Sequence, residues 1–113
     1  MHELSVCEDI IELIEEKAQI ERFKKVLNVT LEIGRLSHVD EQAIRFCFDA
    51  VIQNTLVEGA KLSVVFVDGK GHCQHCDQDS TMDQLYDPCP YCGQFGREIV
   101  TGQQVNLKQL EVC

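Results

Sequence analysis

The sequence predicts an α+β fold in which a short cysteine-bearing module interrupts a domain of two helices and a three-stranded sheet. Two segments place their apolar residues at helical spacing, and three segments place them at strand spacing. Two Cys-x-x-Cys pairs lie between the second and third strand segments. With 113 residues, the chain suits one small domain that carries a still smaller module stapled by a metal ion.

A first helix is expected from about Ser5 to about Ile20. Ser5 and Glu8 form a capping-box pattern, in which a serine and a glutamate three residues later satisfy the free N–H groups of a helix start. An apolar stripe at helical spacing follows, and charged residues lie off it. The stripe consists of Ile10, Ile11, Leu13, Ile14 and Ala18.

The next three elements are expected to be a strand, a helix and a strand. Residues 27–33 alternate apolar and polar side chains, which is typical of a half-buried strand, and Gly34 ends it. A second helix opens at residues 39–41 and stops near Asn54. Residues 62–67 are rich in β-branched side chains and predict the second strand. The inward side chains of the second helix are expected to be Ala43, Ile44, Cys47, Phe48 and Val51.

The last strand is expected at residues 105–112, where apolar residues alternate with one slip of phase that suggests a β-bulge. Such an isolated strand is not stable alone, so we expect it to pair with the sheet of the first part. Residues 68–71 mark a change of composition, which we interpret as a hinge. The predicted domains are therefore residues 1–69 together with 103–113, and an inserted module of residues 70–102.

Four cysteines predict a metal site in the inserted module. They form two Cys-x-x-Cys pairs with twelve residues between them, and each pair puts two sulfurs on one tight turn. A redox pair or a disulfide framework is the alternative, but a redox motif needs only one such pair. Four sulfurs complete the tetrahedron of a zinc ion and leave no open position, so the site is expected to be structural. The ligands would be Cys73, Cys76, Cys89 and Cys92.

The other three cysteines indicate a reducing compartment. Cys7 and Cys47 lie in helical patterns beside apolar residues, where a buried, inert thiol is expected, and Cys113 is expected to be free and exposed. No stretch approaches the run of about eighteen apolar residues that a membrane span needs. The first residues lack the features of a signal peptide. We therefore expect a cytoplasmic protein.

The charge of the chain argues against nucleic acid as a partner. Nineteen acidic residues stand against ten basic ones, and the net charge is −9. Within residues 70–102 the only bases besides histidine are Lys70 and Arg97. A zinc ribbon that binds nucleic acid needs lysines and arginines to neutralise phosphates. A cationic or metal-handling partner suits this chain better.

The first three residues form a second candidate metal site. The amine of Met1, the amide nitrogen of His2 and the His2 ring can close adjacent chelate rings on one ion. Nitrogen-rich coordination favours Ni(II) or Cu(II), and an added carboxylate oxygen, from Glu3 or elsewhere, favours octahedral Ni(II). The alternative is that His2 is simply an exposed side chain. The residues alone leave both interpretations open.

Several motifs, taken together, resemble one known family. They are Met1-His2-Glu3 at the start, residues 31–37 (LEIGRLS), residues 45–49 (RFCFD), residues 58–60 (EGA) and the double Cys-x-x-Cys. In this combination and order the chain closely resembles the HypA/HybF family of hydrogenase nickel-insertion proteins. The resemblance covers the whole chain, including the last predicted strand.

The resemblance implies a nickel metallochaperone and not an enzyme; no nucleophile triad, paired carboxylates or phosphate-binding glycine loop is present. It implies that His2, the Met1 amine and Glu3 hold Ni(II) as cargo, and that the four cysteines hold structural Zn(II). It also implies a HypB-type GTPase and the large subunit of nickel–iron hydrogenase as partners, and in some organisms urease maturation as a further client. A zinc-ribbon protein adaptor without a metal-transfer role is the alternative. The chain could be a monomer or a homodimer.

Three further residues are weighed from the resemblance. Asp40 lies where some family members place a carboxylate near nickel, but it is also well placed to cap the second helix. His72 and His75 flank the first pair of cysteines and are interpreted as solvated loop residues. Some family members carry a histidine beside the second pair, where this chain has Gly93.

Overall fold

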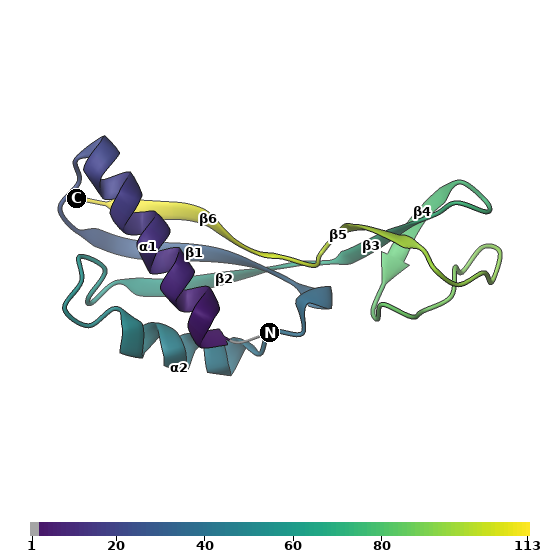
Figure 1. Cartoon of the computed structure of the whole chain (residues 1–113), viewed down its shortest axis with the longest axis horizontal. Coiled ribbons are helices and arrows are strands. Elements are labelled where there is room, and N and C mark those ends of the chain that lie inside the picture. Colours follow the sequence, from purple (N-terminus) through teal and green to yellow (C-terminus); the bar gives the residue numbers. More distant parts are fainter. Residues whose placement is uncertain (1–2) are drawn as a thin grey trace.

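A computed structural model describes residues 3–113 and contains two layers, helices and a sheet, followed by a second, smaller sheet (Figure 1). The fold is α+β, as the sequence predicts. The elements in chain order are α1 (Glu3–Glu21), β1 (Val26–Gly34), the short 3-10 helix η1 (Arg35–Ser37), α2 (Glu41–Val51), β2 (Lys61–Val67), β3 (Gly69–Cys73), β4 (Gln78–Met82), β5 (Glu98–Thr101) and β6 (Val105–Val112).

The first sheet has the strand order β2-β1-β6. β2 runs parallel to β1 and β6 runs antiparallel to it. The predicted return of the last strand to this sheet is therefore confirmed. The predicted bulge is confirmed as well, because Thr30 faces Gln109 whereas Leu31 faces Leu107, which leaves Lys108 as the extra residue.

The core lies between this sheet and the two helices. It joins the apolar stripe of α1 to inward residues of β1 and α2, such as Leu31 and Phe48. The prediction that Leu13 belongs to the buried stripe is wrong, since Leu13 is 40% exposed while the rest of the stripe is buried. The stripe is narrower than the sequence suggests because only one side of α1 contacts α2 and the sheet.

The start of the first helix also differs from the prediction. α1 begins at Glu3, so Ser5 lies inside the first turn and the capping-box interpretation is wrong. An acidic first residue suits a helix start because the free N–H groups there attract negative charge. The second helix does begin as expected: Asp40 is its N-cap, and Asp40 Oδ1 accepts a hydrogen bond from the Gln42 N–H at 3.3 Å. It is also somewhat shorter than predicted and ends at Val51.

Residues 69–101 form a second three-stranded sheet, with the order β4-β3-β5. No strand was expected there, and only Asp68 separates β2 from β3. The interpretation of residues 68–71 as a hinge stays a prediction. Figure 1 shows this sheet extending away from the helices, with the two cysteine-bearing turns beyond it. The division into residues 1–69 with 103–113 and residues 70–102 stays a prediction.

The two sheets meet where three backbone segments cross closely. A side chain at Gly34 would overlap the Gly102 carbonyl, and one at Gly102 would lie 2.6 Å from the Gly69 Cα. Two backbone hydrogen bonds secure the crossing, from the Gly34 N–H to the Gln104 carbonyl (2.9 Å) and from the Leu36 N–H to the Gly102 carbonyl (2.8 Å). The connection between the sheets is therefore a packed glycine crossing, defined by Gly34, Gly69 and Gly102.

Replacing Gly102 by alanine should destabilise the protein by about 3 kcal/mol or more, because the substitution adds a steric overlap to an unfavourable backbone angle. Gly102 has φ +92° and would place its new Cβ against Gly69. Gly59→Ala is the matched control, since Gly59 has φ +84° but open space around it, and only the cost of the backbone angle, about 1–2 kcal/mol, is expected there. Urea denaturation of the zinc-loaded proteins measures both, and equal losses would contradict the importance of the crossing.

The cysteines outside the module lie as the sequence suggests. Cys7 is fully buried, and burial raises the pKa of its thiol to about 12, which makes it unreactive at neutral pH. Cys47 is half-buried against the core and Cys113 is exposed. No helix within residues 3–113 has the length and apolar composition needed to cross a membrane.

Candidate metal sites

The structure brings the four cysteines of the module together. The sulfurs of Cys73, Cys76, Cys89 and Cys92 all lie within 4.8 Å of one another. The Cys73 and Cys92 sulfurs are 3.5 Å apart, and the Cys76 and Cys89 sulfurs are 3.7 Å apart. Four sulfurs bound to zinc at about 2.3 Å would lie about 3.8 Å from one another at the corners of a tetrahedron. The donor set therefore fits a metal such as zinc in size, number and chemistry.

Each pair of cysteines lies on the same kind of turn. The Asp77 N–H donates to the Cys73 carbonyl at 2.8 Å, and the Gly93 N–H donates to the Cys89 carbonyl at the same distance. Both residues that close the turns have positive φ, +57° for Asp77 and +76° for Gly93. Glycine adopts positive φ at no steric cost, which suits Gly93. Aspartate can adopt it too, at a modest steric cost.

The turns prepare the sulfurs for a cation. The N–H of Cys76 points at the Cys73 sulfur and lowers the pKa of that thiol. Burial opposes ionisation of Cys89, but N–H groups of Cys92 and Tyr91 outweigh it and lower its pKa to about 6. Burial raises the pKa of Cys76 to about 12. Four neighbouring thiolates need a positive ion to balance their charge, and a divalent metal supplies it.

Arg97 ties together the segments around the cysteines, which sequence reasoning missed. It is buried, with only 7% of its surface exposed. Its guanidinium donates to Ser80 Oγ at 2.5 Å, to the Thr81 carbonyl at 3.1 Å and to the Asp87 carbonyl at 3.1 Å. Arg97 thus joins strand β4 to the segment before the second pair of cysteines. A lone arginine in an acidic module was the available signal, since such a residue is often paired internally.

The two histidines near the cysteines differ from each other. His75 is exposed in the turn between β3 and β4, as expected. His72 is not a loop residue: it lies half-buried on β3, 2.6 Å from Asp79 Oδ1 through Nδ1 and 3.1 Å from Asp77 Oδ1 through Nε2. The hydrogen bond to Asp79 raises the pKa of His72. Its ring nitrogens are therefore engaged by carboxylates and do not point at the cysteines' metal position.

The N-terminal candidate site is described only in part. Met1 and His2 lie outside the described residues. Glu3 lies beside Asp40, because Glu3 Oε2 accepts a hydrogen bond from the Asp40 N–H at 3.4 Å. Asp40 caps α2 at the same time. His38, which was not singled out from the sequence, lies exposed in the same loop, two residues before Asp40.

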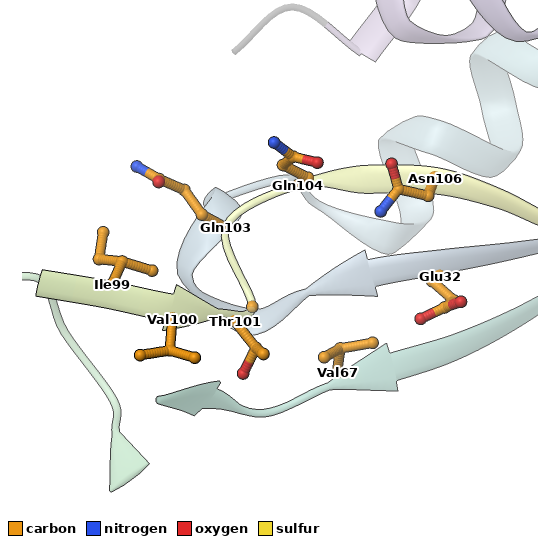
Figure 2. A pocket seen from close by; sticks show the side chains of 9 residues that line it. Glu32, Val67, Ile99, Val100, Thr101, Gln103, Gln104 and Asn106 are labelled. Carbon is orange, nitrogen blue, oxygen red and sulfur yellow. The ribbon is translucent and has the colours of Figure 1, made fainter. Parts of the chain in front are cut away.

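A cavity of about 350 Å³ lies beside the glycine crossing. Figure 2 shows Glu32 and Val67, from the ends of β1 and β2, facing the segment that leads from β5 into β6. The remaining polar lining consists of Thr101, Gln103, Gln104 and Asn106. With one carboxylate and no cysteine or histidine in its lining, this cavity lacks a transition-metal ligand set.

A closed four-sulfur site on a small sheet, attached to a two-layer α+β domain, defines a metal-binding protein. Residues 1–112 match the sequence profile of the family described as "Hydrogenase/urease nickel incorporation, metallochaperone, hypA". The chain belongs to this HypA family. It is accordingly a nickel-incorporation metallochaperone and hydrogenase maturation factor, and not an enzyme.

Relatives of similar length support this assignment. The hydrogenase maturation factor HypA of Psychromonas ingrahamii is 48% identical over 112 residues, which cover 99% of this chain and 98% of that protein. The HypA of Rhodopseudomonas palustris is 45% identical, with 99% of each chain covered. The solution structure of the Ni metallochaperone HypA from Helicobacter pylori superposes with a TM-score of 0.77 at 28% identity, covering 99% of this chain and 97% of that one.

Proposed function

We propose that this chain binds one Ni(II) ion at its N-terminus and, with a HypB-type GTPase, delivers it to the large subunit of nickel–iron hydrogenase. Membership of a nickel-incorporation family supports the proposal. The single structural observation that supports it is the contact of Glu3, the residue that follows His2 in the sequence, with Asp40: the Glu3 carboxylate accepts a hydrogen bond from the Asp40 N–H. Maturation of urease is proposed as a further activity, because the family's description includes urease.

The proposed nickel ligands are the Met1 amine, His2, Glu3 and Asp40. Nitrogen ligands from the first two residues and oxygen from a carboxylate suit Ni(II). Both helices begin at the end of their layer that is nearer the second sheet, so Glu3 and Asp40 lie on that side of the domain (Figure 1). A carrier must release its cargo, and ligands at the start of a chain can separate from the ion without unfolding the domain.

The proposed role of the cysteines is to hold a structural zinc ion. Bound zinc supplies a positive charge that keeps all four thiolates together and leaves no position open for a substrate. The module has little apolar core of its own, with Cys73, Met82 and Cys89 as its buried apolar side chains. Metal binding is therefore part of its folding energy. We place the protein in the cytoplasm, where thiols stay reduced.

A nickel titration of untagged, zinc-loaded protein by calorimetry tests the proposed function. One Ni(II) per chain is the expected result. The absence of nickel binding would contradict the proposal and leave a zinc-containing adaptor protein as the better description.

Replacing Asp40 by asparagine separates its two roles. Asparagine caps a helix about as well as aspartate, so the unfolding free energy should change by less than about 0.5 kcal/mol. It lacks the negative charge that Ni(II) prefers, so nickel affinity should fall at least about tenfold. Asp49→Asn, which removes an exposed carboxylate elsewhere on α2, is the matched control. Unchanged nickel affinity in Asp40→Asn would assign Asp40 to capping alone.

A further inference from the structure

The second pair of cysteines lies in a segment without regular secondary structure. Residues 83–96, which we call the second cysteine loop, lie between β4 and Arg97 and contain no helix or strand (Figure 1). The first pair differs, because Cys73 ends β3 and Cys76 lies in the turn that joins β3 to β4. Backbone pairing between these strands holds the first pair in place. Other contacts must hold the second pair.

One hydrogen bond connects the second cysteine loop to the rest of the module. The Arg97 guanidinium donates to the Asp87 carbonyl, two residues before Cys89, at 3.1 Å. Within residues 3–113, and apart from contacts between cysteine sulfurs, no other hydrogen bond enters the loop from outside it. The loop's other hydrogen bonds are internal, such as that from the Cys89 N–H to the Gln94 carbonyl at 2.9 Å. Arg97 is therefore the anchor of the loop.

Gly71 allows Arg97 to reach across the central strand of the second sheet. Arg97 directly precedes β5, which pairs with one edge of β3, whereas β4 pairs with the other edge. The guanidinium nevertheless donates to Ser80 Oγ and to the Thr81 carbonyl on β4. A Cβ added at Gly71 would lie 3.1 Å from the Arg97 Cβ and would overlap the Met82 sulfur. The arginine side chain thus passes over a glycine in β3.

Arg97 acts through directed hydrogen bonds and not through an ion pair. No carboxylate within residues 3–113 forms an ion pair with it. Its two terminal nitrogens make the contacts with β4 and with the loop, and Nε has no hydrogen-bond partner. A planar guanidinium holds these two nitrogens in a fixed fork, whereas lysine has a single nitrogen on a flexible stem. The fork is therefore what joins the loop to the sheet.

We propose that Arg97 is a positioning residue for the metal centre, because its fork holds the second cysteine loop against β4 and keeps Cys89 and Cys92 facing the first pair. When the fork is lost, the loop opens locally and the second pair leaves the metal before the first pair does. This order is specific to positioning, since a residue that only stabilised the module would loosen all four cysteines alike. The proposal rests on the zinc site of the proposed function.

Alkylation of the zinc-loaded, full-length protein tests the proposal. Iodoacetamide modifies thiols that leave the metal, and mass spectrometry of peptides gives the initial rate at each pair of cysteines. Arg97→Met keeps a long apolar side chain but has no donors. Relative to the wild type, it should raise the rate at the second pair at least about tenfold and the rate at the first pair less than about threefold. Cys113, exposed and outside the cluster, is the internal reference for the reagent.

Two further variants sharpen this test. Arg97→Lys keeps the positive charge without the fork, so it should behave as Arg97→Met does. Arg45→Met is the matched control, because Arg45 also donates to a backbone carbonyl, that of Leu62 at 2.8 Å, but lies on α2, outside the module. The control should alkylate at wild-type rates at both pairs.

Three results would overturn the proposal. They are wild-type rates in Arg97→Met, equal acceleration at both pairs, and wild-type rates in Arg97→Lys, which would show that charge suffices without the fork. The same pattern of acceleration in Arg45→Met would overturn it as well. Zinc content of the wild type separates this proposal from the proposed function, because a wild-type protein that retains no zinc would contradict the zinc site itself.

Discussion

Replacing His2 by alanine should abolish tight nickel binding while zinc content and fold stay unchanged. The substitution removes the imidazole and with it the chelate ring that joins the side chain to the chain's own nitrogens. The Met1 amine and the proposed carboxylate ligands Glu3 and Asp40 would remain, but without the imidazole they form a much weaker ligand set for Ni(II). We expect the affinity to fall at least about a hundredfold, measured by calorimetry on untagged protein. A tag matters because extra histidines create nickel sites and an extended N-terminus blocks the Met1 amine.

The matched control for this variant is His75→Ala, which removes an exposed imidazole from the turn between β3 and β4. It should leave nickel binding intact. Retained nickel affinity in His2→Ala, or an equal loss in both variants, would refute an N-terminal site. A loss confined to His2→Ala would establish the site and direct attention to its two neighbouring carboxylates.

Replacing Cys92 by alanine should release zinc and unfold the second sheet. Three remaining sulfurs cannot close the tetrahedron, and structural zinc contributes about 10–16 kcal/mol to the folding of small zinc peptides. Little apolar burial remains in the module to compensate for that loss. The first sheet, with its own core of helix and strand residues, should stay folded. Metal analysis and amide hydrogen exchange along the chain would show both effects.

Cys113→Ala is the control for thiol loss, because Cys113 is exposed and lies outside the cluster. It should retain zinc and melt as the wild type does. A Cys92→Ala protein with wild-type circular dichroism and melting would contradict a folding role for the metal. Protection from exchange in β3 of that variant would do the same.

Apolar periodicity in the sequence predicted the elements that pack against the main core. The alternation of residues 27–33 predicted β1, and the slip of phase in residues 105–112 predicted the bulge in β6. β3 and β4 have no such signal, since their sequences are GKGHC and QDSTM. Backbone pairing, thiolates and Arg97 stabilise the second sheet. None of these interactions produces the apolar alternation in the sequence from which a strand is predicted.

The two candidate metal sites also differ in how much of each could be predicted from the sequence. Spacing alone predicted the four-cysteine cluster, because each pair is local and two pairs make one tetrahedron. The contact between Glu3 and Asp40 joins residues 37 positions apart, and only the packing of α1 against α2 brings them together. Asp40 caps α2, as one of its two interpretations expected, and its N–H also contacts Glu3; its role as a nickel ligand stays a prediction.

The glycine crossing has a consequence for how this architecture can diversify. The chain enters the second sheet at Gly69 and leaves it at Gly102, and these two residues touch through their backbones. Thr101 Oγ1 also donates a hydrogen bond to the Asp68 carbonyl at 3.1 Å, which holds the two ends of the segment together at the glycine crossing. The whole segment between Gly69 and Gly102, which contains β3, β4 and β5, therefore begins and ends at the same place in the fold. We therefore expect changes of length at the far end of this segment to leave the register of β1, β2 and β6 unchanged.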